Sequence, residues 1–138
     1  MTIEAENMDV VRRLIAAIEV FDADTAAALY HPEVVQTEHP NAIYPKGQVR
    51  SAEMMLRDLP RGRQVLRSQR YPIDAIFAGG DRVAVETRWE GILDVPLGKR
   101  QPGDALVAHI CMVFTLRDGR VISQNNYDCY EGMATKVD

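Results

Sequence analysis

The C-terminal part of the chain reads ALVAHICMVFTLRDGRVISQNNYDCY at residues 105–130. Near its middle, Asp118-Gly119 is typical of a two-residue turn between two strand-like runs, residues 105–116 and 120–130. The segment therefore predicts a long antiparallel hairpin. Its register decides which side chains share a face of the sheet.

The predicted register places polar residues together. If the turn is tight, the numbers of facing residues sum to 237, so that His109 faces Asp128 and Cys111 faces Asn126. Facing residues have Cβ atoms about 4.5–5.5 Å apart on one sheet face. With Gln124 on the same face, the hairpin predicts a polar cluster suited to proton transfer or to binding a polar group.

The opposite face of this hairpin is more apolar and carries Ile110, Met112 and Phe114. One interpretation is that the apolar face packs against helices while the polar cluster meets water. The other is that both faces are covered, one by helices and one by a second subunit, because the polar face also carries Cys111, a residue type that is rarely exposed.

The rest of the chain predicts helices first and strands later. Met8, Val11, Leu14 and Ile18 have the spacing of an amphipathic helix, and a short second helix ends near Tyr30. Helices gathered at one end and strands at the other indicate an α+β fold, in which one curved sheet wraps over a helical layer. The length of 138 residues fits a single domain, residues 1–138. The further expected elements are a short strand at residues 34–39, a helix at about 51–59, and strands at 69–78 and 82–94.

Composition and charge limit the functions. The net charge of −4 and the lack of a long basic run disfavour a nucleic-acid partner. No apolar run approaches the roughly 20 residues that span a bilayer, and the first residues have no apolar signal core, so we expect a cytoplasmic location and no membrane partner. His39, His109, Glu38 and Asp128 lack a metal-binding spacing, and no glycine-rich phosphate loop is present, so neither a metal nor another cofactor is expected.

A second polar group lies in the strand predicted at residues 82–94. Glu86, Arg88 and Glu90 alternate with apolar residues that include Trp89. Such alternation is typical of a solvated ladder of salt bridges. It also fits a polar cluster at the mouth of a pocket, in which Arg88 would hold a neighbouring carboxylate in its charged form.

Two segments carry a family resemblance. They are HPEVVQTEHPN at residues 31–41, which leads to Gly47 and a helix, and FTLRDGRVI at residues 114–122, which leads to Tyr127. With the order of elements, they resemble the nuclear transport factor 2-like superfamily over about residues 5–131, in particular its SnoaL-like polyketide cyclases, ketosteroid isomerases and limonene epoxide hydrolases. The resemblance implies a conical, cystatin-like barrel in which a curved, mostly antiparallel sheet wraps around three N-terminal helices. It also implies a pocket between the concave sheet and the helices, and a homodimer formed through the outer sheet face.

The resemblance suggests roles for individual residues. In the isomerases the general base lies just before the proline that ends the first strand, and that position is His39 here, preceded by Glu38. The cyclases resemble this chain through a histidine on the fourth strand and an aspartate on the fifth, for which His109 and Asp128 are the candidates. The isomerase tyrosine of the first helix is missing, because no tyrosine precedes Tyr30, and this argues against a steroid-type enolisation.

The epoxide hydrolases place an arginine between two aspartates. The corresponding positions resemble Arg88, Glu90 and Asn126 in this chain. Asn126 cannot act as a carboxylate, so the hydrolase mechanism is not expected in unchanged form.

The residues and the resemblance together predict a site for a small, largely apolar molecule. The predicted catalytic residues are His39, His109 and Asp128, with Asp128 orienting His109 and keeping it basic. One hypothesis is a cofactor-independent isomerase, cyclase, dehydratase or hydrolase that uses acid–base chemistry. The other is a non-catalytic ligand-binding or dimerisation module on the same fold. The residues expected to line the pocket are Tyr30, Gln36, Glu38, Arg88, Glu90, Cys111, Gln124 and Asn126.

Overall fold

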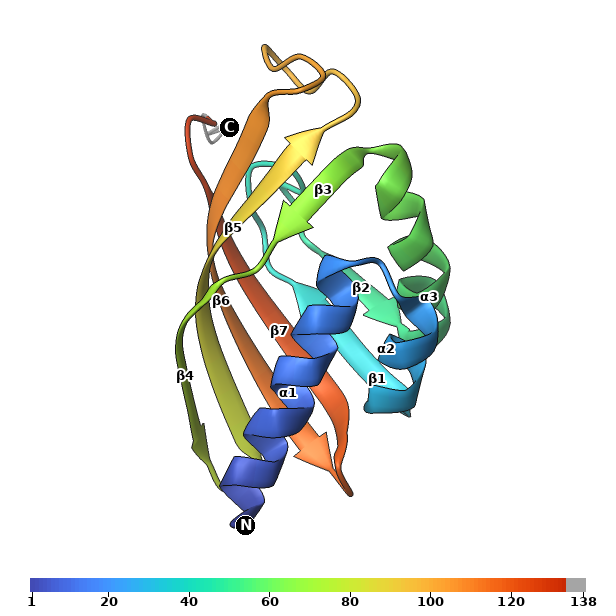
Figure 1. Cartoon of the computed structure of the whole chain (residues 1–138), viewed down its shortest axis with the longest axis vertical. Helices are drawn as coiled ribbons and strands as arrows, with labels where there is room; N and C mark the ends of the chain where they lie inside the picture. Colours follow the sequence, from blue (N-terminus) through green and yellow to red (C-terminus); the bar gives the residue numbers. More distant parts are fainter. Residues whose placement is uncertain (134–138) are drawn as a thin grey trace.

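A computed structural model describes residues 1–133, which form three α-helices and a strongly curled seven-stranded sheet (Figure 1). The predicted α+β fold, with a curved sheet around N-terminal helices, is confirmed. The helices are α1 (Ile3–Glu19), α2 (Ala23–Leu29) and α3 (Ala52–Arg61), and α3 continues into the short 3-10 helix η1 (Gly62–Gln64). The strands are β1 (Tyr30–Glu38), β2 (Gln48–Ser51), β3 (Leu66–Arg70), β4 (Ile73–Gly79), β5 (Arg82–Leu93), β6 (Ala105–Arg117) and β7 (Arg120–Tyr130).

Short polar side chains determine where the helices begin. The hydroxyl of Thr2 accepts a hydrogen bond from the amide of Ala5 (3.1 Å), and the carboxylate of Asp22 accepts one from the amide of Thr25 (3.1 Å). Ser51 caps α3 in the same way. Because Ser51 is also the last residue of β2, this cap fixes the point at which α3 leaves the sheet.

The strand order in the sheet is β2-β1-β7-β6-β5-β3, and β4 also pairs with β5. β1 and β7 run parallel, while the other neighbouring pairs are antiparallel. The sheet curls around α1, which lies on its concave side, and α2 and α3 lie beside β1 and β2 (Figure 1). This arrangement gives the sheet a concave face that is covered by helices and an outer face that is not.

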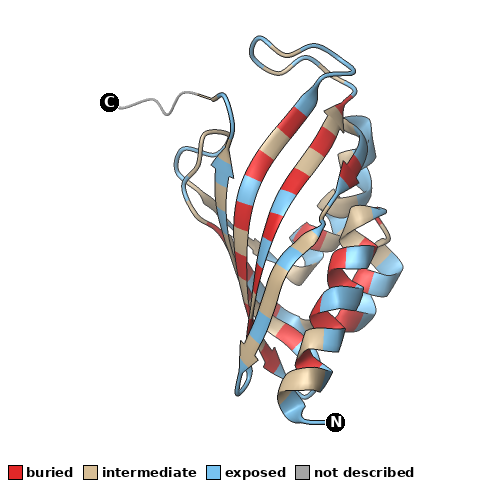
Figure 2. Cartoon of the chain, turned by 60° about the vertical axis from the view of Figure 1, so that its left-hand side comes forward, coloured by how far each residue is buried: buried red, intermediate tan, exposed pale blue. Residues whose placement is uncertain are grey.

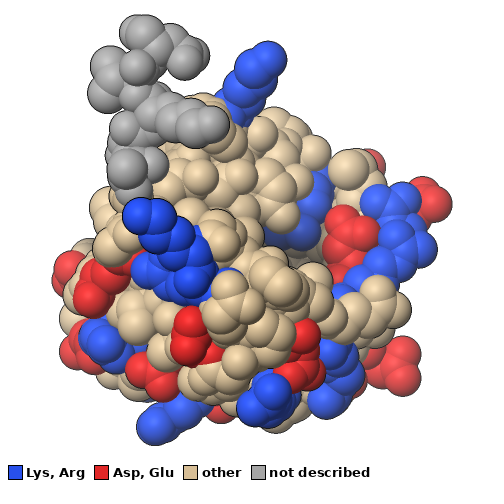
Figure 3. Space-filling model, turned by 90° about the horizontal axis from the view of Figure 1, so that it is seen from above, with Lys and Arg blue, Asp and Glu red and all other residues tan. Residues whose placement is uncertain are grey.

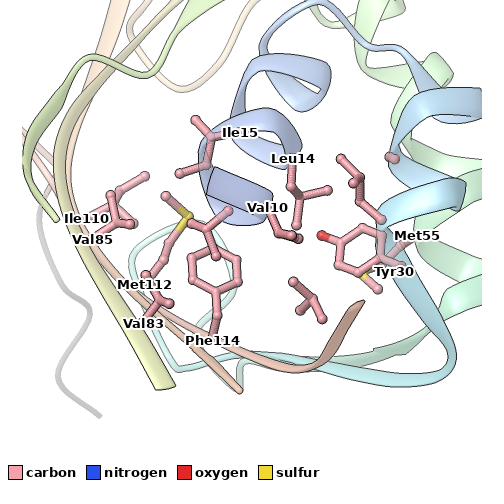
Figure 4. Packing of buried hydrophobic residues seen from close by; sticks show 14 of the residues in the cluster. Val10, Leu14, Ile15, Tyr30, Met55, Val83, Val85, Ile110, Met112 and Phe114 are labelled. Atoms are coloured by element: carbon pink, nitrogen blue, oxygen red, sulfur yellow. The ribbon is translucent and has the colours of Figure 1, made fainter. Parts of the chain in front are cut away.

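The hydrophobic core lies on the concave face. Burial alternates along β5 and β6, which appears as coloured bands in Figure 2. The buried side chains of Val85, Met112 and Phe114 point toward Leu14 and Ile15 of α1 (Figure 4). Contacts between these side chains hold α1 against the sheet.

Three further features concern one predicted strand, the helices and the surface charges. The single strand predicted at residues 69–78 is divided into β3 and β4, because Pro72 between them has no backbone N–H to donate to a ladder. Within residues 1–133 none of the helices is long and apolar enough to cross a membrane. Seen from above, acidic and basic side chains are interspersed over the visible surface (Figure 3).

The turn of the last hairpin is as predicted. Asp118 and Gly119 both have a positive φ, 52° and 76°. This is the conformation of a type I′ turn, for which aspartate and glycine are well suited. The strands on either side of the turn are β6 and β7.

The register of this hairpin differs from the prediction. Beside the turn, Leu116 pairs with Val121, and the residue numbers sum to 237. The next pair is Thr115 with Ser123, and from there on the sum is 238. Ile122 is therefore the extra residue of a β-bulge. A shift of one residue moves every later side chain of β7 to the other face of the sheet.

The bulge separates the predicted catalytic pair. His109 pairs with Cys129 on the outer face, and Asp128 pairs with Ile110 on the concave face. The prediction that His109 faces Asp128 is therefore wrong. The polar side chains that were expected on one face are divided, since those of β6 lie outside and those of β7 turn inward.

Candidate functional site

The concave face of the sheet and the helices line a partly open cavity of about 260 Å3. Its apolar wall is formed mainly by α1, α3 and β6. Its polar wall is formed by the neighbouring strands β2, β1 and β7, whose inward side chains lie side by side on the concave face. The apolar wall includes Ile15, Ile18, Leu56, Leu59 and Ile110.

The bulge in β7 turns the side chains of Gln124, Asn126 and Asp128 into this cavity. A hydrogen bond links the first two of them. The hydroxyl of Tyr30 donates a hydrogen bond to Oε1 of Gln124 (2.6 Å), and Nε2 of Gln124 donates one to Oδ1 of Asn126 (3.0 Å). The parallel pairing of β1 with β7 places Gln36 beside Gln124 and Glu38 beside Asn126. These bonds fix the orientation of the polar wall before any ligand binds.

Arg50 reaches the polar wall from β2. Its Nε donates a hydrogen bond to Oε1 of Gln36 (2.8 Å), and its Nη1 lies 3.9 Å from Oδ2 of Asp58. Gln48 on the same strand donates a hydrogen bond to Oε2 of Glu38 (3.0 Å). Since Glu38 is only 8% exposed, the cavity wall contains a buried carboxylate and a guanidinium group on neighbouring strands.

Asp128 is the third polar side chain that β7 directs inward. Its Oδ1 is buried and has no hydrogen-bond partner among residues 1–133. Burial, and then the negative charge of Glu38, raise the pKa of Asp128 to about 7, although the hydroxyl of Tyr130 and the charge of Arg50 lower it in part. At neutral pH this carboxyl group therefore populates both protonation states. Such a group can accept a proton and return it.

The cavity that Asp128 lines also carries three aromatic rings, those of Tyr71, Trp89 and Tyr130. The ring of Trp89 is 6.4 Å from the ring of Tyr71 and 6.4 Å from that of Tyr130, measured between centroids. The indole N–H of Trp89 donates a hydrogen bond to Oε1 of Gln69 (3.0 Å), which fixes the ring. Burial raises the pKa of both tyrosines, so their hydroxyl groups are protonated donors at neutral pH.

Gly91 makes room for this indole ring. A Cβ at this position would lie 2.7 Å from two ring carbons of Trp89 and 2.9 Å from Leu66. Contacts this short are repulsive, so only glycine allows the ring to lie against the backbone of β5.

The structure places both predicted catalytic histidines outside the cavity. Nε2 of His39 lies 2.9 Å from Oδ1 of Asn125, and the imidazole stacks on the ring of Tyr127 at 4.4 Å. Nε2 of His109 lies 2.7 Å from Oε2 of Glu131, and the side chain is 59% exposed. The predicted support of this imidazole by a carboxylate of β7 is wrong, because the two groups lie on opposite faces of the sheet.

Arg88, Glu90 and Cys111 also lie outside the cavity, so their predicted place in its lining is wrong. Nη1 of Arg88 lies 3.5 Å from Oε2 of Glu90, and the Arg88 side chain is 48% exposed. The alternating charges of β5 are therefore a solvated ladder. Cys111 pairs with Tyr127 on the outer face.

The cavity lining combines predicted residues with residues that sequence reasoning missed. Trp89 and Tyr130 occupy inward positions of the strand alternation, and with the correct register that alternation would have identified both. Arg50 and Tyr71 lie on or beside short strands that gave no clear pattern. No group of three His, Cys, Asp or Glu side chains within the described residues could hold a metal ion. The predicted residues that line the cavity are Tyr30, Gln36, Glu38, Gln124, Asn126 and Asp128.

The curled sheet, the helical cover and the partly polar cavity define a nuclear transport factor 2-like α+β domain. Residues 11–124 match the family model of the SnoaL-like domain, and the chain belongs to this family. No curated protein matches the chain in sequence.

Solved structures share the fold at low sequence identity. A protein from Jannaschia sp. CCS1 that is assigned as a SnoaL-like polyketide cyclase has 22% identity and a TM-score of 0.76, over 93% of this chain and 88% of that chain. IdmH from Streptomyces antibioticus, also assigned as a polyketide cyclase, has 21% identity and a TM-score of 0.74, over 88% and 91%. An LEH-like epoxide hydrolase from M. tuberculosis has 22% identity and a TM-score of 0.70, over 93% and 84%.

Proposed function

We propose that this SnoaL-like domain is a cofactor-independent enzyme that transfers protons on a small, largely apolar molecule, with Asp128 as the proton-transferring group. One observation carries the proposal. Asp128 has a buried oxygen without a partner among residues 1–133 and a pKa raised to about 7, and it lines the cavity between the sheet and the helices. Strongly perturbed acids in cavities are common among catalytic groups.

The surrounding residues support a specific course of reaction. Ionised Asp128 removes a proton from a carbon next to a carbonyl group, and the electron pair of that C–H bond moves onto the carbonyl oxygen. The protonated hydroxyl groups of Tyr71 and Tyr130 are available to donate hydrogen bonds to this oxygen as it becomes negative. Asp128 then returns the proton to another carbon of the conjugated system, which gives an isomerisation. Alternatively, the enolate carbon attacks a second carbonyl carbon of the same molecule, the π electron pair of that carbonyl moves onto its oxygen, and Asp128 returns the proton to this oxygen, which gives a ring closure.

The similar structures support the same range of reactions. Two are assigned as polyketide cyclases and one is an epoxide hydrolase. An isomerase, cyclase, dehydratase or hydrolase would each use an acid–base group in an enclosed pocket. The apolar wall of helices α1 and α3 suits the hydrocarbon part of such substrates.

A non-catalytic ligand-binding module is the second candidate. It is favoured by the position of the two histidines that were predicted to be catalytic, His39 and His109, because both lie outside the cavity. In this function Asp128 and the polar wall would orient a ligand without reacting with it.

Proton exchange separates the two candidates. The protein is incubated in D2O with α-tetralone, a small ketone, and deuterium incorporation next to the carbonyl is followed by NMR. We expect deuterium exchange faster than in buffer alone. The exchange rate should fall about 100-fold or more in Asp128→Asn, because the amide of asparagine cannot accept the proton. His109→Ala is the control and should keep the wild-type rate. Equal rates in Asp128→Asn and wild type would refute the role of Asp128, and binding without exchange would favour the second candidate.

We also propose a homodimer formed through the outer sheet face. The support is a row of uncharged side chains that crosses this face and ends in two exposed apolar residues, Val49 (62% exposed) and Phe77 (57% exposed). Apolar side chains on a sheet face that no helix covers often mark protein interfaces. By strand pairing the row comprises Val49, Thr37, Asn125, Val113, Ala84 and Phe77.

A further inference from the structure

We propose that the end of the cavity beside Asp128 binds a protonated amine, so that the ligand is a largely apolar molecule with one ammonium group. This inference deepens the proposed function, since it names the ligand class of the same cavity. It depends on three features of the cavity: an aromatic corner, two carboxylates beside that corner, and the position of Arg50.

The aromatic corner consists of Tyr71, Trp89 and Tyr130. The ring planes of Tyr71 and Trp89 are inclined at 53°, and those of Trp89 and Tyr130 at 85°. The three rings are therefore not stacked on one another, and all three residues line the cavity. The faces of tyrosine and tryptophan rings attract cations, and groups of such rings bind substituted ammonium ions.

Two carboxylates lie within electrostatic range of this corner. The negative charges of Asp128 and Glu38 both contribute to the raised pKa values of Tyr71 and Tyr130, and Glu38 also raises the pKa of Asp128. Both acids line the cavity. An anionic ligand would therefore be repelled from this end, whereas a cation would be attracted to it.

Arg50 does not neutralise these acids at close range. Its guanidinium group is held by Gln36 and approaches Asp58, and among residues 1–133 no ion pair within 4.0 Å connects it to Glu38 or Asp128. The buried Oδ1 of Asp128 also lacks a hydrogen-bond donor. An ammonium N–H directed at this oxygen would supply both the missing donor and the missing positive charge.

The rest of the cavity determines the body of the ligand. The walls beyond the corner are aliphatic and come from Ile15, Ile18, Leu56, Leu59 and Ile110. A cavity of about 260 Å3 leaves room for a compact hydrocarbon group attached to the nitrogen. The expected ligand is therefore an amine with a cyclic or branched apolar group.

Three isosteric probes test the charge preference. They are cyclohexylmethylamine, cyclohexylmethanol and cyclohexanecarboxylate, and binding is measured by calorimetry and by the fluorescence of Trp89, the single tryptophan of the chain. We expect the amine to bind about tenfold or more tightly than the alcohol, and the carboxylate to bind least. An amine that binds no more tightly than the alcohol, including a failure of both to bind, would overturn the proposal.

The pH dependence gives an independent readout. Asp128 is faced by Glu38 from β1, Arg50 from β2, Tyr130 from β7 and Tyr71 from the segment between β3 and β4. Because an ammonium group prefers the ionised carboxylate, the affinity for the amine should rise severalfold, at most about tenfold, between about pH 6 and about pH 8. The affinity for the alcohol should stay level or fall. An amine affinity that is flat or falls over this range contradicts the proposal.

Variants test whether the carboxylates of Asp128 and Glu38 cause the preference for the amine. Asp128→Asn and Glu38→Gln should each weaken amine binding about tenfold while leaving alcohol binding within about twofold. His109→Ala, which alters a histidine outside the cavity, should change neither. Amine binding that is unaffected by both acid variants overturns the proposal.

The outcomes also separate this inference from the proposed function. If Asp128→Asn abolishes deuterium exchange into the neutral ketone but the amine is not preferred, proton transfer stands and the ligand class is wrong. If the amine is preferred but no exchange occurs, the ligand class stands and the catalytic role fails.

Discussion

Asp128 makes the stability of the protein depend on pH. Its pKa is about 7 in the folded protein against an ordinary value of 3.8, so the folded state holds this proton more firmly than the unfolded state. The proton on Asp128 therefore contributes to the free energy of unfolding. This contribution is fully present below about pH 4 and is lost as the pH rises through about 7. The ionised carboxylate thus destabilises the protein at neutral and higher pH.

Asp128→Asn should therefore be more stable than wild type at about pH 8 and equally stable at about pH 4. The expected difference at the higher pH is about 1–2 kcal/mol, because water that enters the cavity screens part of the effect. Urea unfolding followed by Trp89 fluorescence measures it. The exposed Asp74 provides the control, since Asp74→Asn should show no such pH-dependent gain. A gain of equal size at both pH values would contradict the assignment.

Gly91 gives a second prediction at the scale of a residue. Gly91→Ala places a methyl group 2.7 Å from the Trp89 ring, so we expect a loss of about 1–3 kcal/mol in the free energy of unfolding and a shift in the Trp89 emission spectrum. Gly79→Ala is the matched control, because nothing lies within 4 Å of a Cβ there, and it should change stability by no more than about 0.5 kcal/mol. An unchanged emission spectrum in Gly91→Ala would show that the indole is not held as described.

The bulge at Ile122 determines the site at the scale of an element. Deletion of Ile122 would join Val121 directly to Ser123, whose partners Leu116 and Thr115 are already consecutive. The later pairs, and the inward direction of Asp128, would then be preserved. We expect this deletion variant to fold, with a loss of about 1–2 kcal/mol in stability.

Deletion of Asn125 is the contrasting variant. It would move Asn126 and Asp128 to the outer face, and we expect it to lose cooperative unfolding and the native Trp89 emission. Circular dichroism and fluorescence during urea unfolding compare the two variants. If both deletions are tolerated equally, the bulge does not determine which side chains of β7 point into the cavity.

The same hairpin illustrates what the sequence could and could not predict. Asp118-Gly119 identified the turn because few other residue pairs adopt two successive positive φ angles. Ile122 and Ser123 are ordinary strand residues, and nothing in their chemistry indicates a bulge. The strands were therefore predictable, whereas the pairing of their side chains, and with it the position of Asp128, was not.

The predicted residues of β1 show the complementary case. Gln36 and Glu38 alternate with outward side chains on a strand without a bulge between them, so their shared face followed from the period of two. Arg50 was missed because β2 has only four residues, too few for a pattern. At this scale, sequence reasoning succeeds where a strand is long and regular.

The outer face of the sheet gives a prediction for the whole molecule. Val113 lies at the middle of the row that we propose as the dimer interface, so Val113→Arg should convert a dimer into a monomer. Light scattering coupled to size-exclusion chromatography measures the mass. Val65→Arg places the same charge at an exposed valine outside the row and should leave the dimer intact. A monomeric wild type, or a dimer that survives Val113→Arg, would exclude this interface.

The parallel pairing of β1 and β7 has a consequence for biosynthesis. The cavity is lined by segments that lie far apart in the sequence, since Glu38 is the neighbour of Asn126. A nascent polypeptide emerging from the ribosome therefore carries an incomplete half-shell with exposed hydrocarbon surface until β7 has been translated. Protection by chaperones during that interval would then contribute, together with the stability of the finished domain, to how much of it accumulates in a cell.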